Sequence, residues 1–148
     1  MIVLDTDILT IVQRAASEEY TRLVGRLDAA PDQPVCVTIV TFEEQMRGWL
    51  AFSARAKSLA KQIHAYAHLR ALLEDFHTRP ILDFENRAAQ EFQHLVKSRI
   101  RIGTMDLKIA AITLVHDATL VSRNLADFRK VPGLKVEDWT TQTDDGDR

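Results

Sequence analysis

Short apolar runs alternate with longer stretches of helical periodicity along this chain. The second of these runs is rich in β-branched residues, as a strand buried in a parallel sheet is. The runs lie at Ile2–Leu4, Val35–Val40, 80–82, Thr119–Val121 and Leu134–Val136, the last as an edge strand. Strands that alternate with helices predict an α/β fold with a central, mostly parallel sheet of four to five strands.

Apolar positions near helical spacing predict the helices between these strands. The expected helices run from about 8 to 30, from about 42 to 76 with a break near Ser53, from 85 to 97, from 105 to 116, and over one turn at 124–128. Thr104 is expected to cap the helix at 105–116. The polar, acidic segment 140–148 is expected to be a disordered tail, which leaves residues 1–139 as one domain.

Composition narrows the class of protein. A chain of 148 residues that is 46% apolar and 27% charged is typical of one globular domain. The opening run Met1–Leu4 is far shorter than the roughly 18 residues of a membrane span, and it lacks a basic leader, so we expect a cytoplasmic protein. The single cysteine, Cys36, excludes a disulfide framework and multi-cysteine metal sites. A net charge of −2 restricts nucleic-acid binding to local basic patches.

Polar residues gather where the predicted strands end. They are Asp5 and Asp7 after the first strand, Glu44 after the second, Asp106 in the first turn of the helix before the fourth, and Ser122, Asn124 and Asp127 after the fourth. Crossover helices run antiparallel to parallel strands, so helix N-termini and strand carboxyl ends meet at one edge of the sheet. We therefore expect four carboxylates, called here the edge acids, to share that edge. The edge acids are Asp5, Glu44, Asp106 and Asp127.

Clustered carboxylates repel one another unless a cation neutralises them. Oxygen ligands favour hard cations, here Mg²⁺ or Mn²⁺, and the lack of His or Cys near these positions argues against zinc. Helix N-termini at the same edge favour a phosphate. The pattern is typical of metal-assisted phosphodiester hydrolysis.

Most of these residues also have a purely structural interpretation. Asp7 is the expected N-cap of the first helix, and Thr41-x-x-Glu44 has the form of a capping box. Asp106 suits a helix dipole, and Asn124 with Asp127 resembles an N-cap followed by an acid at N3. Asp5 stands apart, because Asp7 is free to cap the helix and leaves Asp5 without a structural role.

Four motifs resemble the PIN-domain family, most closely its VapC-type toxin ribonucleases. They are Val3-Leu4-Asp5-Thr6-Asp7-Ile8-Leu9, Thr38-Ile39-Val40-Thr41-Phe42-Glu43-Glu44 with Gly48, Asp106-Leu107-Lys108-Ile109-Ala110-Ala111, and Leu120-Val121-Ser122-Arg123-Asn124-Leu125-Ala126-Asp127-Phe128. The resemblance covers about residues 1–139. The motif order matches the family, although Leu107-Lys108 and the Glu43-Glu44 doublet depart from its usual pattern.

The resemblance implies a three-layer α-β-α fold and a metal-dependent endoribonuclease. Asp5, Glu44 and Asp106 would be the core Mg²⁺ or Mn²⁺ ligands, with Asp127 as a further one. Ser122, Asn124 and Asp7 would support the site. The resemblance further implies a homodimer that cuts structured RNA and that a small antitoxin neutralises.

Several other side chains are candidates for binding. Lys97, Arg99, Arg101 and Lys108 flank Asp106 and are candidates for RNA phosphate contacts. A second basic set, Arg47, Arg55, Lys57, Lys61 and Arg70, lies on the long helical segment. A solvated helix face is an equal alternative for both sets. Trp49 and Trp139 could stack on bases, but packing in the core or at an interface is the expected role. His64 and His68 have a helical metal-pair spacing but lack the Glu of HExxH.

Two other functions are compatible with these residues. In a haloacid-dehalogenase-type phosphatase, Asp5 would be the nucleophile, Asp7 the acid/base and Ser122 the second-motif hydroxyl. That chemistry needs a lysine and an acidic pair downstream, and Asp144-Asp145 lies in the predicted tail. The other alternative is a PIN-like binding module without catalysis.

Overall fold

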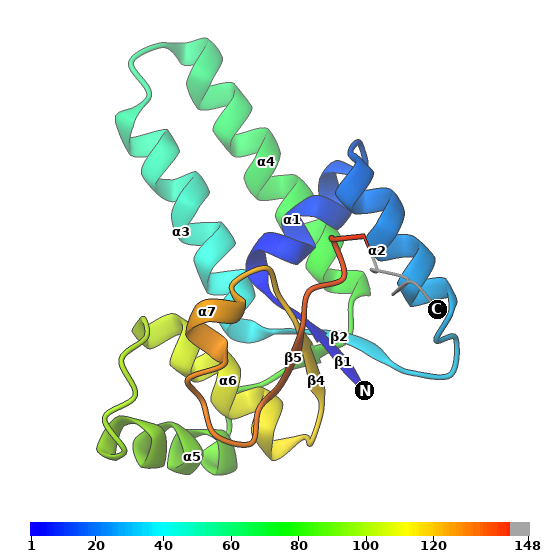
Figure 1. Cartoon of the computed structure of the whole chain (residues 1–148). Coiled ribbons are helices and arrows are strands. Elements are labelled where there is room, and N and C mark those ends of the chain that lie inside the picture. Colours follow the sequence, from blue (N-terminus) through cyan, green and yellow to red (C-terminus); the bar gives the residue numbers. More distant parts are fainter. Residues whose placement is uncertain (143–148) are drawn as a thin grey trace.

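The residues that the structure describes, 1–142, form a five-stranded sheet and seven helices in this computed structural model. All strands are parallel and lie in the order β3-β2-β1-β4-β5 (Figure 1). Their bounds are β1 Ile2–Leu4, β2 Val35–Thr38, β3 Ile81–Leu82, β4 Thr119–Val121 and β5 Lys135–Glu137. This confirms the predicted α/β class, the parallel sheet and the edge position of the last strand.

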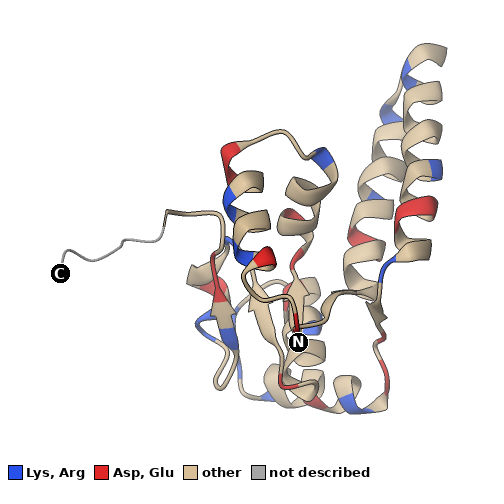
Figure 2. Ribbon diagram, turned by 90° about the vertical axis from the view of Figure 1, so that its right-hand side faces the viewer, with Lys and Arg blue, Asp and Glu red and all other residues tan. Residues whose placement is uncertain are grey.

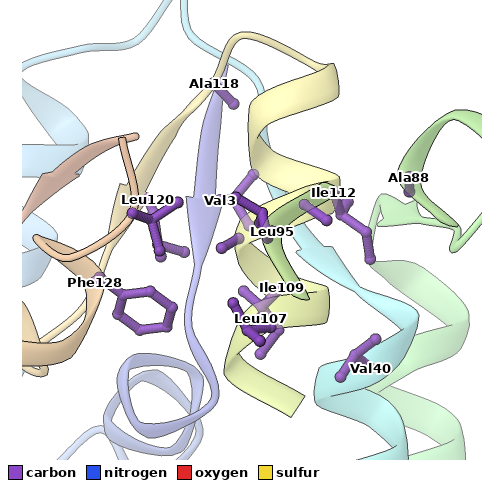
Figure 3. Packing of buried hydrophobic residues seen from close by; sticks show 13 residues of the cluster. Val3, Val40, Ala88, Leu95, Leu107, Ile109, Ile112, Ala118, Leu120 and Phe128 are labelled. Carbon is purple, nitrogen blue, oxygen red and sulfur yellow. The ribbon is translucent and has the colours of Figure 1, made fainter. Parts of the chain in front are cut away.

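The sheet separates two hydrophobic clusters, so the fold has three layers. Successive side chains of a strand point to opposite faces. Val3 accordingly packs with α5 (Asn86–Lys97) and α6 (Thr104–Val115), as Figure 3 shows. Ile2 and Leu4 instead pack with α1 (Thr6–Arg14), α2 (Glu18–Asp28) and the end of α4 (Leu59–Thr78). Burial on both faces explains why β1 is apolar throughout.

The single helix expected over 8–30 is wrong, because the chain forms α1 and α2 instead. Ala15 ends α1 in the left-handed conformation, with φ 50°, and its N–H donates to Ile11 O. Ser17 then caps α2, its Oγ accepting from Tyr20 N at 3.1 Å. The apolar periodicity continues across this break and conceals it.

The second strand is shorter than expected. It ends at Thr38, and α3 occupies Ile39–Arg55, because Thr38 Oγ1 caps the helix by accepting from Thr41 N at 3.1 Å. The predicted strand end at Val40 and helix start at 42 are therefore wrong.

The helices α3 and α4 form a long antiparallel hairpin that projects beyond the sheet (Figure 1). The break expected near Ser53 occurs at 56–58, where Ser58 Oγ accepts from Lys61 N and begins α4. The apolar side chains of α4 that point outward are Leu59, Ile63, Tyr66 and Leu73, each at least 60% exposed.

The remaining helices lie close to their expected positions. α6 begins at Thr104 itself, and its N-cap residue is Gly103, so the expected Thr104 cap is wrong. α7 is the single turn Leu125–Phe128. Six residues of α6 are buried, since it lies against the sheet, α5 and α3.

Thr140, which begins the segment predicted to be a disordered tail, is 4% exposed. Its carbonyl accepts from Arg22 Nη1 at 3.1 Å, and its hydroxyl donates to Asp138 Oδ1. The rest of that predicted tail, 143–148, lies outside the described residues. Of the helices in 1–142, none has both the length and the apolar character needed to cross a membrane.

Candidate active site

The carboxyl ends of β1, β2 and β4 lie at one edge of the sheet, together with the N-termini of α1, α3 and α7 (Figure 1). Asp5 directly follows β1, and its N–H donates to Val121 O of β4 at 3.0 Å. Ser122 follows β4 in the same way. Parallel pairing therefore brings together residues from distant parts of the chain.

Asp5 is the most deeply placed acid of this edge, at 6% exposure. Its Oδ1 accepts from Thr6 N and its Oδ2 from Ser122 Oγ, both at 2.8 Å. Burial raises the pKa of Asp5 to about 7, the negative charges of Asp7 and Asp106 add to the rise, and the two hydrogen bonds oppose it. A carboxyl group here resists ionisation unless positive charge is supplied.

Asp5 is also the N-cap residue of α1, through the bond from Thr6 N. The prediction that Asp7 caps this helix is therefore wrong, and so is the argument that Asp5 has no structural role. Asp7 lies in the first turn instead, where Oδ2 accepts from Arg123 Nε at 3.1 Å. Its Oδ1 is buried with no hydrogen-bond partner within 1–142.

Ser122 links Asp5 to the loop after β4. It is fully buried, donates to Asp5, and accepts from Asn124 N at 2.9 Å. Asn124 Nδ2 in turn donates to Asp127 Oδ2 at 3.1 Å. The loop thus holds two of the edge acids through a short chain of hydrogen bonds.

Glu44 reaches the same edge from the second turn of α3. Its Oε1 accepts from Thr6 Oγ1 at 2.7 Å, and Thr6 Oγ1 lies 3.2 Å from the buried Thr41 Oγ1. Since Thr38 caps α3, the predicted Thr41-x-x-Glu44 capping box is wrong. Sequence reasoning did not single out the hydroxyl of Thr6, although its position next to Asp5 was a signal.

Asp106 lies in the first turn of α6. Burial raises the pKa of Asp106, and the negative charges of Glu44, Asp127 and Asp7 raise it further. Asp127 behaves in the opposite way, because the hydrogen bonds from Asn124 and from Lys130 Nζ lower the pKa of Asp127. Mutual repulsion thus couples Asp106 to acids from three other segments.

These acids share an edge but do not form a ready-made metal cage. Within residues 1–142, no group of three or more His, Cys, Asp or Glu side chains is arranged to hold a metal ion. Ser122, Asn124, Thr6 and Lys130 each already bind a carboxylate oxygen there.

The basic residues predicted to flank Asp106 lie in two different surroundings. Lys97 ends α5, and Arg99 and Arg101 lie in the following loop, where all three are exposed. Lys108 Nζ instead lies over the rings of Phe84 and Phe92, at 5.7 and 5.8 Å from their centroids.

Known proteins resemble this chain in sequence. The family model described as PIN domain matches residues 2–134. The chain is 28% identical over 110 residues to a "tRNA(fMet)-specific endonuclease VapC" of Salmonella typhimurium, which covers 71% of this chain and 75% of that protein. It is 38% identical over 74 residues to "Ribonuclease VapC2" of Haemophilus influenzae, covering 47% of this chain and 56% of that protein.

Solved structures share the whole fold. VapBC-1 from nontypeable Haemophilus influenzae superposes with a TM-score of 0.73 at 21% identity, covering 95% of this chain and 100% of that one. VapBC2 from Rickettsia felis, bound to a DNA fragment from its promoter, gives 0.67 at 25% identity, with 94% and 99% covered. The resemblance inferred from the four motifs is confirmed.

Proposed function

This chain belongs to the PIN domain family, and we propose that it is an endoribonuclease toxin that hydrolyses RNA with the help of Mg²⁺ or Mn²⁺. The relatives named ribonuclease support the reaction, and the acidic edge supports its location. The single observation that carries the proposal is the buried Asp5, whose raised pKa reflects burial and the nearby charges of Asp7 and Asp106.

The residues present fit a hard cation. Mg²⁺ keeps several of its waters and usually takes only one or two protein carboxylates, so a preassembled cage of three is not required. Asp5, Glu44 and Asp106 would hold the ion, directly or through its waters, with Asp127 as a further ligand. The buried oxygen of Asp7 that has no partner within 1–142 is an atom that a nearby cation would stabilise. When bound, such an ion supplies Lewis-acid polarisation of the phosphodiester and activation of water.

The chain's own residues orient the carboxylates. Ser122 fixes one oxygen of Asp5, and the N–H of Asn124 fixes Ser122. Thr6 holds Glu44, while Lys130 offsets the charge of Asp127. The N-terminal turn of α3 lies at this edge, and its helix dipole favours binding of the phosphate. The exposed Lys97, Arg99 and Arg101 contact phosphates of the RNA in this proposal, and Lys108 remains a weaker candidate.

A small antitoxin is the proposed partner, and the active chain is proposed to be a homodimer. Neighbours described as VapBC assemblies, and one described as a toxin-antitoxin complex from Klebsiella pneumoniae, support the antitoxin.

The two alternative functions are not favoured. The matched family is PIN rather than a phosphatase family, and Asp144-Asp145, which the phosphatase would need, lies outside the described residues. A PIN-like binding module without catalysis is not favoured, because the relatives are named as ribonucleases.

The test is cleavage of total RNA by the purified chain with Mn²⁺, Mg²⁺ or EDTA, followed by sequencing of the new RNA ends. We expect defined cuts with either metal and none with EDTA. Asp106→Asn should abolish these cuts while leaving the thermal unfolding temperature unchanged or higher, because it removes repulsion. Asp117→Asn, at an exposed acid paired with Lys135, is the matched control and should cut normally. Full activity of Asp106→Asn, or equal activity in EDTA, would refute the proposal.

A further inference from the structure

An open pocket lies between α1 and the α3–α4 hairpin, beside the acidic edge. Its volume is about 670 Å³. Thr6 lines one end of it, and the same Thr6 donates to Glu44, so the pocket continues directly from the candidate active site. Its far end is lined by Arg14 and Arg55.

Aromatic rings form part of its wall. Trp49 and His68 lie parallel, with centroids 3.9 Å apart and an angle of 6° between the rings. Phe52 and His64 contact Trp49 edge-on, with centroids 5.7 and 5.8 Å away. Burial and the charge of His64 lower the pKa of His68, which favours a neutral ring. Trp49, expected in the core or at an interface, lines this pocket.

The wall also contains a gap where a side chain would fit. Gly48 lines the pocket, and a Cβ placed on it would meet nothing within 4 Å. Glycine in the middle of a helix is unfavourable relative to other residues, so this position leaves room at some cost to α3.

The hairpin beside the pocket is positively charged. Residues 45–73 contain five Lys or Arg and no Asp or Glu. Figure 2 shows blue along the outer part of the hairpin and red only near its base. Arg47 and Arg70 pair with Glu43 and Glu74 at that base. Within 1–142, no salt bridge engages Arg14, Arg55, Lys57 or Lys61.

We propose that this pocket binds a base of an unpaired stretch of RNA, stacked against the Trp49–His68 pair, while Arg55, Lys57 and Lys61 contact the adjoining phosphates. The inference rests on the proposed function and adds a subsite to it. Proteins that bind unpaired RNA combine aromatic platforms with a basic track. An anionic strand that leaves the acidic edge through this pocket meets positive charge along the hairpin. The lining of the pocket contains one acid, Asp75, which already pairs with Arg79, so the basic side chains Arg14 and Arg55 remain for an anionic ligand.

The binding test uses the full chain in EDTA, so that no RNA is cut. Short oligoadenylate and oligouridylate are titrated while tryptophan fluorescence is followed, with an abasic oligoribose-phosphate of equal length as the baseless probe. We expect saturable quenching by the oligonucleotides and none by the abasic probe. Gly48→Leu should fill the pocket without disturbing α3 and should raise the Kd about tenfold or more, as loss of one stacked base does.

Gly25→Leu is the matched control. Gly25 also lies in a helix with nothing within 4 Å of an added Cβ, but it belongs to α2, outside this pocket. Its Kd should stay within about twofold of the wild-type value, since no stacked base is lost.

Equal Kd values for Gly48→Leu and wild type would overturn the inference, as would quenching by the abasic probe. So would a Gly48→Leu chain that binds oligonucleotide normally but fails to bind a peptide partner, because the occupant would then be a peptide. Binding in EDTA is independent of catalysis, so it decides the subsite even if cleavage is never found. Conversely, if cleavage depends on metal but Gly48→Leu keeps the wild-type KM, the proposed ribonuclease function stands and the subsite is rejected.

Discussion

Ser122 Oγ donates a 2.8 Å hydrogen bond to Asp5 Oδ2, and both side chains are buried although they lie 117 positions apart in the sequence. The bond exists because β1 and β4 are neighbouring parallel strands that end together. It orients the acid on which the proposed chemistry depends.

Ser122→Ala should leave Asp5 Oδ2 buried without this donor. An acceptor that loses its buried partner costs about 1–3 kcal/mol, so we expect the free energy of unfolding to fall by about that amount. Cleavage should fall as well, because Asp5 becomes free to turn. Urea unfolding and RNA cleavage are the measurements. Ser98→Ala, which removes an exposed hydroxyl that donates to His94 O, is the control and should change neither. If Ser122→Ala changes neither the free energy of unfolding nor RNA cleavage, the hydrogen bond does not position Asp5.

Asp7→Asn tests whether the buried Asp7 Oδ1 takes part in cation binding. We expect about a tenfold loss in apparent Mn²⁺ affinity, measured from the metal dependence of cleavage, as is typical for groups that support a metal site. The ion pair with Arg123 is partly exposed, so Arg123→Gln should change the free energy of unfolding by less than about 1 kcal/mol. Glu18→Gln, in the surface pair with Arg22, is the control. Wild-type Mn²⁺ dependence in Asp7→Asn would restrict Asp7 to pairing with Arg123.

Asp75 joins α4 to the chain that follows it, and it should make stability depend on pH. Burial raises the pKa of Asp75, but hydrogen bonds from Arg79 and Gln13 and the charge of Arg79 outweigh burial and hold this pKa below its usual value. A lowered carboxyl pKa stabilises the fold at pH values above the unfolded-state pKa, and this contribution is lost as pH falls through the folded-state pKa.

Asp75→Asn should therefore cost about 1 kcal/mol at neutral pH, and its difference from wild type should shrink towards zero in strong acid. Urea unfolding gives the free energy of unfolding of both chains from neutral pH to strong acid. Subtracting one value from the other cancels the contribution of every other titrating group. Glu74→Gln removes an exposed acid from the Arg70 pair and should give a small difference at every pH. A constant Asp75→Asn difference down to strong acid would contradict the assignment.

Ala15 adopts a left-handed conformation that is costly for a residue with a Cβ. Ala15→Gly should raise the free energy of unfolding by about 0.5–1 kcal/mol, because glycine adopts this conformation without strain. Thermal unfolding measures the effect. Ala16→Gly, at the next residue, lacks this benefit and should lower stability or leave it unchanged. A destabilised Ala15→Gly chain would show that the turn between α1 and α2 gains nothing from glycine.

The sheet was predictable because its three central strands, β1, β2 and β4, are short, rich in β-branched residues and mostly buried on both faces. The shared edge followed from element order alone. Local patterns failed at the helix starts. Two acids two positions apart, Asp5 and Asp7, are equally good caps in sequence, and the choice falls to Asp5 because its N–H still pairs with Val121 across the sheet. Thr38 precedes Thr41 as a cap for a similar reason, since β2 ends two residues before its apolar run does.

Contacts between distant segments were beyond sequence reasoning. The bond from Thr6 to Glu44 and the pair of Asp7 with Arg123 depend on how α3 and the loop after β4 pack against α1. No spacing rule links such residues.

The continuity of α3 over Ile39–Arg55 has a further consequence. Glu44 and Trp49 stand on one continuous helix, five residues apart, which is a rise of about 7.5 Å. If the proposed subsite holds, α3 fixes the distance between the bond that is cut and the base that is bound. Each inserted residue also turns the helix by about 100°, so an insertion of about seven residues, two turns, is needed to keep both side chains on their present faces while shifting the cut along the RNA.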